Sequence, residues 1–219
     1  GSEMCIRDRY IDITLFASAI EGTKSEWGEL PNKTDLAKAI SEFSGADTSN
    51  MRNWYSDYSS LSGEIQVFHC QRENVRWDYD LHKSYIYFQI GILLVAIVAM
   101  VVTMFIVNPD FIKLVCILSW LTPLVEYTYS VCKEICESVS LLKKINAFCD
   151  QIENKLSEEN NVSVKQELIA LQYKIRERRE NGFLIPDWFY KMRKGKQQKQ
   201  EDCIAETIVN LSQENGEHR

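Results

Sequence analysis

The sequence predicts a mainly α protein in which a transmembrane helical hairpin is flanked by a mostly helical cytoplasmic domain built from chain on both sides of it. Three observations predict this class. Residues 85–107 carry no charge, residues 111–129 are again mostly apolar, and the segments on either side repeat their apolar residues every three or four positions. The last pattern is typical of amphipathic helices.

The first apolar run is long enough to cross a bilayer. It holds 23 consecutive residues without a charged side chain. At about 1.5 Å per residue such a helix is about 34 Å long, and a hydrocarbon core is about 30 Å thick. The alternative is a buried core hairpin in a soluble protein, but the run exceeds the roughly 18 residues that mark a membrane span.

A second span follows a short turn at residues 108–110. Pro109 ends the first helix there, and Asp110 is placed to cap the next one. The second span, residues 111–129, is less apolar because it contains Lys113, Pro123 and Glu126. Lys113 lies near the turn, where its side chain can extend to the water interface.

The charges that flank the hairpin predict its orientation. Basic residues lie on both outer flanks, whereas the turn has only Lys113 nearby; these flanking residues are Arg72, Arg76, Lys83, Lys133, Lys143 and Lys144. The positive-inside rule therefore places both termini in the cytoplasm and the turn outside. Four tyrosines stand where an aromatic belt would form on the cytoplasmic rim: Tyr85, Tyr87, Tyr127 and Tyr129.

Composition narrows the functional classes. The net charge is -6 and the sequence pI is about 5.2, so a nucleic-acid duplex is not an expected partner. A small anionic ligand held by a few local arginines is compatible with this balance. The seven cysteines show no zinc spacing, and reduced thiols in a cytoplasmic setting account for them. We expect no metal and no cofactor.

The chain divides into six segments. Residues 1–9 are interpreted as foreign, because Gly1-Ser2 resembles a tag remnant and residues 4–9 resemble a translated sequencing-adaptor fragment. Residues 10–60 form a soluble cytoplasmic segment, in which residues 10–16 fit either a strand or the start of a helix. A juxtamembrane helix over 61–84 leads into the hairpin at 85–129, and a helical pair with an aromatic segment occupies 130–193. Residues 194–219 are expected to be a fraying polar tail.

The juxtamembrane helix carries a polar cluster at Cys70–Asn74 and Trp77-Asp78. One interpretation is a solvated helix face with local pairs, Arg76 with Asp80 and Asp78 with His82. After the hairpin, apolar stripes over residues 141–156 and 164–175 predict two antiparallel helices packed face to face. A capping box at Ser163 and Gln166 begins the second of these helices, and Asn181-Gly182 is typical of its end.

Residues 183–190 are dense in aromatic side chains and contain Pro186. One interpretation is a hydrophobic plug that docks on the helical pair. The alternative is an aromatic wall that stacks on a nucleobase, with Arg176 and Arg179 nearby for phosphate.

Three motifs together resemble a known family. They are Asn53-Trp54-Tyr55, then Gln71-Arg72-Glu73-Asn74 followed by Trp77-Asp78, and finally Pro186-Asp187-Trp188-Phe189-Tyr190. In this order, just before and after a membrane hairpin, they resemble the SMODS-associated four-transmembrane (S-4TM) effectors of bacteria. Members of that family typically have two more membrane helices ahead of the soluble segment, so the resemblance implies that a first hairpin is missing before Tyr10.

The resemblance implies a role in cyclic-oligonucleotide anti-phage signalling (CBASS) at the bacterial inner membrane. A CD-NTase enzyme would make a nucleotide second messenger, and this chain, as a homo-oligomer, would respond by forming or opening a pore that kills the infected cell. No P-loop, Rossmann glycine pattern, HExxH or GxSxG occurs in the sequence, so we do not expect an enzyme. The alternative function is a membrane adaptor that recruits a cytoplasmic partner without ion flow.

Residue types suggest which side chains would bind a ligand and which would line a path for ions. The candidates for ligand contact are the arginines and aromatics of the motifs and the helical pair: Arg72, Arg176, Arg178 and Arg179 for phosphate, with Trp54, Tyr55, Trp188 and Tyr190 for base stacking. The candidates for a pore lining are the polar residues of the spans: Thr103, Ser119, Thr122 and Glu126. Hydrogen bonding between the two helices explains the latter set equally well.

Overall fold

The computed structural model describes residues 3–20, 24–35, 37–38, 55–61, 63–107, 110–158 and 163–217. Its elements in chain order are the helices α1 (Glu3–Ala19), the 3-10 turn η1 (Lys24–Trp27), α4 (Gly63–Val107), α5 (Phe111–Glu158), α6 (Lys165–Asn181) and α7 (Asp187–Glu217). Across these ranges the chain is helix and loop without a strand, which confirms the predicted mainly α class. Residues 10–16 belong to α1, so the strand alternative for them is wrong.

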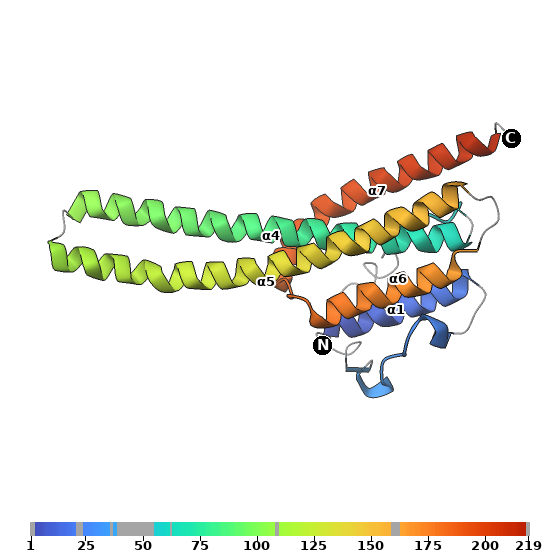
Figure 1. Cartoon of the computed structure of the whole chain (residues 1–219), viewed down its shortest axis with the longest axis horizontal. Coiled ribbons are helices and arrows are strands. Elements are labelled where there is room, and N and C mark those ends of the chain that lie inside the picture. Colours follow the sequence, from blue (N-terminus) through green and yellow to red (C-terminus); the bar gives the residue numbers. More distant parts are fainter. Residues whose placement is uncertain are drawn as a thin grey trace.

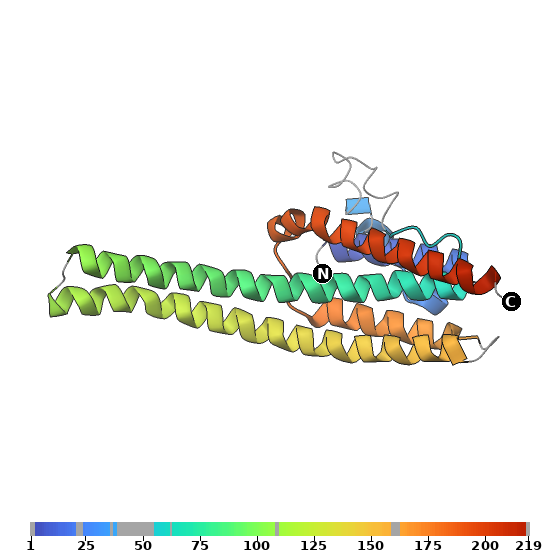
Figure 2. The ribbon, with the colours of Figure 1, turned by 90° about the horizontal axis from the view of Figure 1, so that it is seen from above.

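Two very long helices dominate the molecule. α4 has 45 residues and α5 has 48, about 68 and 72 Å at the usual rise. Figures 1 and 2 show them side by side along their whole length, with one half projecting as a hairpin and the other half packed among α1, α6 and α7. The predicted juxtamembrane helix and first span are therefore one helix. The second span likewise continues into the helical pair, and Pro123 lies inside α5 without ending it.

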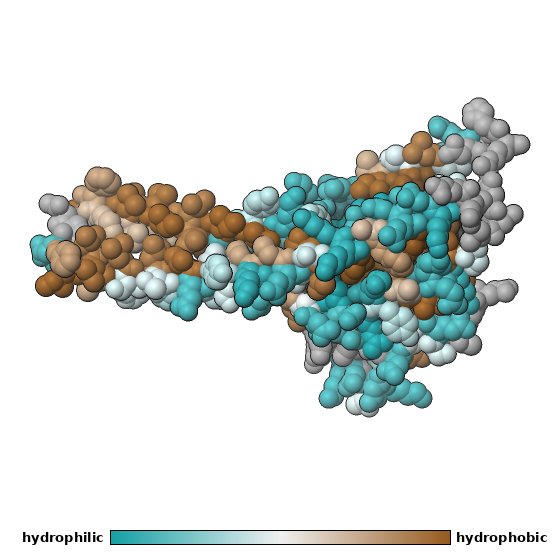
Figure 3. Space-filling view, in the orientation of Figure 1, coloured by the Kyte–Doolittle hydropathy of each residue, from teal (hydrophilic) through white to brown (hydrophobic). Residues whose placement is uncertain are grey.

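The hairpin half has the composition of a membrane segment. Both helices are long and apolar enough to cross a bilayer, and their most apolar windows are scarcely buried within the molecule. Large apolar side chains such as Phe105, Ile106 and Phe111 are exposed there. Figure 3 shows mostly hydrophobic atoms over the hairpin and mostly hydrophilic atoms over the rest. A soluble core hairpin would be buried, so this distribution favours lipid as the surrounding solvent.

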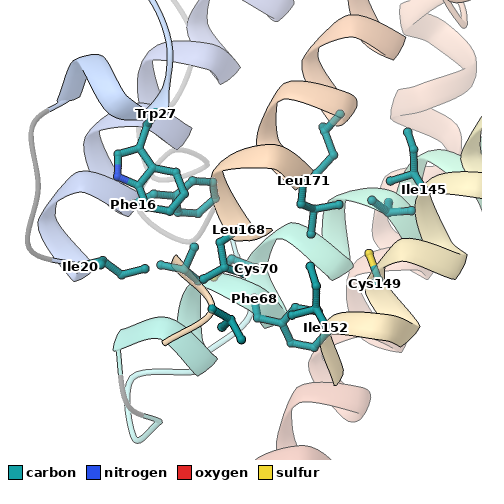
Figure 4. Close-up of a cluster of buried hydrophobic side chains, with 14 of the residues drawn as sticks. Phe16, Ile20, Trp27, Phe68, Cys70, Ile145, Cys149, Ile152, Leu168 and Leu171 are labelled. Carbon is teal, nitrogen blue, oxygen red and sulfur yellow. The ribbon is translucent and has the colours of Figure 1, made fainter. Parts of the chain in front are cut away.

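The main core lies in the bundle half and joins α1, α4, α5, α6 and α7. Figure 4 shows Phe16 and Trp27 packing beside Leu168 of α6, with Phe68 of α4 and Ile152 of α5 next to them. Both apolar stripes predicted after the hairpin enter this core, so the antiparallel packing of α5 and α6 is confirmed. A second, smaller cluster lies where the hairpin leaves the bundle, and we call this level the neck; it comprises Leu81, Tyr85, Val131, Ile135 and Phe189.

The ends of α6 differ from the sequence prediction. Ser163 and Gln166 do not close a capping box; instead Glu64 of α4 accepts hydrogen bonds from the Ser163 hydroxyl at 2.6 Å and the Val164 amide at 2.7 Å. A carboxylate in this place suits the positive end of the helix dipole. At the other end Gly182 is the cap, but its backbone is extended rather than left-handed. A Cβ there would lie 2.6 Å from the Arg178 carbonyl oxygen, so close approach explains the glycine.

The polar C-terminal segment is helical rather than frayed. α7 continues to Glu217 and lies along α4, with Gln197, Glu201 and Ala205 buried. The residues on its packed face recur every four positions, from Phe189 to Ala205, which is the spacing of one helix face. The sequence did not predict this face because three of its five residues, Arg193, Gln197 and Glu201, are polar or charged.

Gly63 tests the packing of α1 against α4. A Cβ at Gly63 would lie 2.3 Å from the carbonyl oxygen of Ala19, a backbone atom that cannot rotate away. We expect Gly63→Ala to lower the free energy of unfolding by about 1–3 kcal/mol, the range for overpacking. Gly195→Ala in α7 is the matched control, because nothing lies within 4 Å of its Cβ. The control should be neutral or stabilising by up to about 1 kcal/mol in detergent-solubilised melts, and equal effects would contradict the close contact.

Candidate functional site

A buried polar network crosses the bundle from α1 to α6. Asp12 of α1 is fully buried and accepts hydrogen bonds from the Tyr55 hydroxyl and, at 3.2 Å, from the Gln172 side chain. The Asn74 amide donates to the Tyr55 oxygen at 2.6 Å, and the Gln71 amide donates to the Gln172 oxygen at 3.1 Å. Burial raises the pKa of Asp12, although Arg179, Tyr55 and Gln172 each act to lower it.

The network continues into an ion cluster nearer the neck. Arg178, 6% exposed, donates to the Asp78 carboxylate at 2.6 Å and to His82 Nε2 at 2.6 Å. Arg179 bridges the two parts, with 3.5 Å to Asp12 and 3.7 Å to Asp78. Burial acts to raise the pKa of Asp78, but Arg178, Arg179 and His82 outweigh it and the pKa is lowered. Burial and then Arg178 lower the pKa of His82, so the ring is neutral and can accept the guanidinium hydrogen bond.

Several residues of the polar cluster predicted on the juxtamembrane helix belong to this network, among them Gln71, Asn74 and Asp78. Gln71, Glu73 and Asn74 are buried, so the interpretation of a solvated helix face is wrong for them. The Asp78 carboxylate pairs with Arg178 of α6, and the His82 ring bonds to the backbone carbonyl of Asp78 rather than to its side chain. Arg76 pairs with Glu201 of α7 at 2.7 Å rather than with Asp80.

Glu73 and Glu201 form a second buried acidic group between α4 and α7. The Ser56 amide donates to both Glu73 carboxylate oxygens at 3.3 Å, and the Ser56 hydroxyl donates to Asp202 at 3.1 Å. Burial first, opposed by the Ser56 amide and assisted by the Glu201 charge, raises the pKa of Glu73 to about 7 from its ordinary 4.5.

The raised pKa of Glu73 predicts a pH-dependent stability. Because the folded state binds the Glu73 proton more tightly than the unfolded state does, the contribution of Glu73 to stability is greatest below pH 4.5 and is lost as pH rises through about 7. Glu73→Gln keeps the shape without the charge, so its melting temperature relative to wild type should rise over this window and level off above it. Glu137→Gln, at an exposed position of α5, is the control and should track the wild type. A constant difference between Glu73→Gln and wild type across this range would contradict the assignment.

The structure does not gather the predicted phosphate-binding arginines into one site. Arg72 pairs with Asp150, at 2.9 Å, and with Glu153 on α5. Arg176 pairs with Glu180, and Arg178 and Arg179 belong to the buried network. All four therefore have carboxylate partners within the chain. Their role in ligand binding stays a prediction, and the contacts seen are those of residues that hold helices together.

The aromatic candidates are also separated. Tyr55 is part of the buried network, and Trp54 lies outside the described residues. Phe189 is buried in the neck cluster, where its ring centroid is 4.9 Å from that of Tyr85. The ring centroids of Trp188 and Phe88 are 5.3 Å apart, and those of Tyr190 and Trp77 are 6.1 Å apart. The segment thus docks as a plug, as one interpretation predicted, but on the α4–α5 neck rather than on the α5–α6 pair.

Sequence reasoning missed a pocket between α4 and α5. It has a volume of about 320 Å³, at the lower end of the usual range for ligand pockets. Its lining comes from both long helices: Val75, Arg76, Tyr79, Asp80, Lys143 and Asn146. Within the described part of the chain, Lys143 and Asn146 have no hydrogen-bond or ionic partner. The only signal in the sequence was the i, i+3 spacing of Lys143 and Asn146, which is common on any exposed helix.

The four pore-lining candidates lie on the exposed surface of the hairpin. The hydroxyls of Thr103 and Ser119 each donate at 2.8 Å to the carbonyl four residues earlier in their own helix, Ala99 and Val115. These two hydroxyls therefore bond within their own helices and do not join α4 to α5. Thr122 and Glu126 are exposed beside Ser119, away from the buried positions of α5 such as Thr128 and Val131.

These features define a membrane protein with a long two-helix hairpin that is continuous with a polar-networked helical bundle. The chain belongs to the family of the SMODS-associating 4TM effector domain, whose family model matches residues 9–208. It is thereby a membrane effector associated with CBASS and linked to CD-NTase signalling. No curated protein and no solved structure matches the chain.

Proposed function

We propose that the protein is activated by a cyclic oligonucleotide second messenger to form or open a pore in the bacterial inner membrane, causing abortive infection. The bundle would be cytoplasmic, with both termini on that side, and several copies would assemble. The protein has no catalytic role in this scheme.

The observation that carries the proposal is the polar row Ser119, Thr122 and Glu126 on the exposed side of α5. In Figure 3 paler and hydrophilic atoms run along the α5 side of the otherwise hydrophobic hairpin. A carboxylate facing lipid is costly, so such a row normally faces a partner helix or water. A ring of hairpins from several copies would turn these rows inward and line a path for ions.

The pocket between α4 and α5 supports activation by a small anionic ligand. Lys143 offers a cationic donor for phosphate, beside Arg76, which pairs with Glu201. Asp80 and Asn146 can bond a base edge, and the Tyr79 ring offers a stacking face. Because α4 and α5 continue unbroken from this pocket into the hairpin, a ligand that changes their separation there would move the membrane half as well.

Ion flow tests the proposal directly. Proteoliposomes loaded with a fluorescent dye should leak when cyclic oligonucleotides made by a CD-NTase are added, and linear dinucleotides should not cause leakage. Glu126→Ala should change the conductance or abolish leakage, because it alters the proposed lining. Glu137→Ala, outside the span, is the control. Sealed vesicles that nevertheless bind the ligand would favour the adaptor alternative and contradict the pore.

A further inference from the structure

An apolar surface remains uncovered at the start of α7. Leu184, Trp188 and Met192 expose 53%, 53% and 58% of their surface. Trp188 and Met192 are one helical turn apart on the same side of α7, next to the face that packs on α4. Exposed apolar groups of this size gathered at one place mark a binding surface rather than ordinary scatter.

This surface lies at the level where the hairpin would enter the bilayer. Trp188 contacts Phe88, and Arg193 donates to the Ser84 hydroxyl at 3.0 Å. Ser84 and Phe88 bracket the first turn of the apolar run in α4. From there α7 runs back along α4 toward the far end of the bundle, as Gln197 bonding to the Trp77 carbonyl and Figure 2 show. Only the first turns of α7 therefore meet the membrane boundary.

Basic side chains adjoin the apolar surface. Lys191 and Lys196 are exposed, and within the described part of the chain neither has an ionic partner. Among the residues that the structure describes, none bonds to the buried Nε of Arg193. One carboxylate, Asp187, is exposed at the same end of the helix. An apolar wedge with lysines beside it matches the boundary between acyl chains and anionic headgroups.

We propose that Leu184, Trp188 and Met192, with Lys191 and Lys196, form an interfacial anchor that inserts into the leaflet on the bundle side and binds anionic phospholipid headgroups. The anchor ties the start of α7 to the membrane surface. Its occupant is lipid, so it works with or without a nucleotide ligand, and its failure would leave the proposed pore untouched.

Fluorine NMR of the full chain, with its five tryptophans labelled as 5-fluorotryptophan and reconstituted in vesicles, measures the depth of Trp188. Trp188→Phe assigns the resonance. Nitroxide-labelled phosphatidylglycerol should broaden it more than labelled phosphatidylcholine, and an aqueous gadolinium chelate should broaden it least. Trp27, buried in the bundle, and Trp120, exposed on the hairpin, supply the protected and lipid-facing references.

Matched variants separate the two parts of the anchor. Lys191→Gln with Lys196→Gln should remove the preference for phosphatidylglycerol, about fivefold per lysine, whereas Lys144→Gln with Lys199→Gln should retain it. Leu184→Gln with Met192→Gln should weaken the effect of both lipid labels, and Leu211→Gln, equally exposed at the other end of α7, should not. Broadening of Trp188 mainly by the aqueous chelate would overturn the anchor, and equal broadening by the two lipids would overturn its binding of anionic headgroups.

Discussion

Replacing Asp78 with Asn is expected to lower the free energy of unfolding by about 3–5 kcal/mol, the range for removing one partner of a buried ion pair. Asp78 is the carboxylate that Arg178 contacts at 2.6 Å and that Arg179 approaches at 3.7 Å. Without it the Arg178 guanidinium, almost wholly buried, keeps its charge and loses the carboxylate that it contacts at 2.6 Å. The measurement is a thermal or denaturant unfolding series on the detergent-solubilised protein.

The matched control for this experiment is Asp150→Asn. Asp150 also pairs with an arginine of α4, Arg72 at 2.9 Å, but the Asp150 side chain is 53% exposed, and Arg72 keeps Glu153 as a second partner. Its loss should cost about 0–1 kcal/mol. The double variant Asp78→Leu with Arg178→Met should be more stable than Asp78→Asn, because it replaces both members of the buried ion pair by apolar side chains. Similar effects of Asp78→Asn and Asp150→Asn would show that the network is not buried in the way described.

Replacing Lys143 with Ala is expected to raise the ligand concentration for half-maximal dye release by about 10–150-fold. This range corresponds to the loss of one hydrogen bond to a charged group, about 1.5–3 kcal/mol. Lys143 lines the pocket between α4 and α5, and its ammonium is the α5 cation available to a phosphate there. The melting temperature without ligand should stay unchanged, since Lys143 has no hydrogen-bond or ionic partner within the described chain.

Lys144→Ala provides the control for the pocket. Lys144 is the next residue of α5, has the same charge and is exposed, but it does not line the pocket. Its ligand response should equal that of the wild type. If Lys143→Ala and Lys144→Ala respond alike while both still leak, the ligand binds elsewhere and the predicted set around Arg72 and Arg179 becomes the next one to test.

Local patterns were sufficient for the hairpin and for the helical pair that follows it. An uncharged run at residues 85–107 and the apolar stripes after the hairpin follow from burial and lipid exposure, which act on each helix by its own periodicity. The pairing of polar residues was not accessible in the same way. Asp78 has a plausible local partner in His82, yet it pairs with Arg178, 100 residues away, because the tertiary fold places α6 against α4.

The same reason explains the polar tail and the pocket. Glu201 and Gln197 are expected to be solvent-exposed from the sequence alone. In the fold α7 lies along α4, where Arg76 pairs with Glu201 and the Gln197 amide donates to the Trp77 carbonyl. Lys143 and Asn146 are ordinary surface residues on an isolated helix and become a pocket wall only opposite Tyr79.

The sequence by itself determined that the protein is helical, that it carries a membrane hairpin and which family it belongs to, because hydrophobicity, periodicity and short motifs are local properties of the chain. The tertiary structure decided which motif residues are buried, which charges neutralise each other, and where a cavity and an uncovered apolar surface remain. Those depend on which distant segments share a face, and the free energy that selects them comes from packing across helices rather than along them.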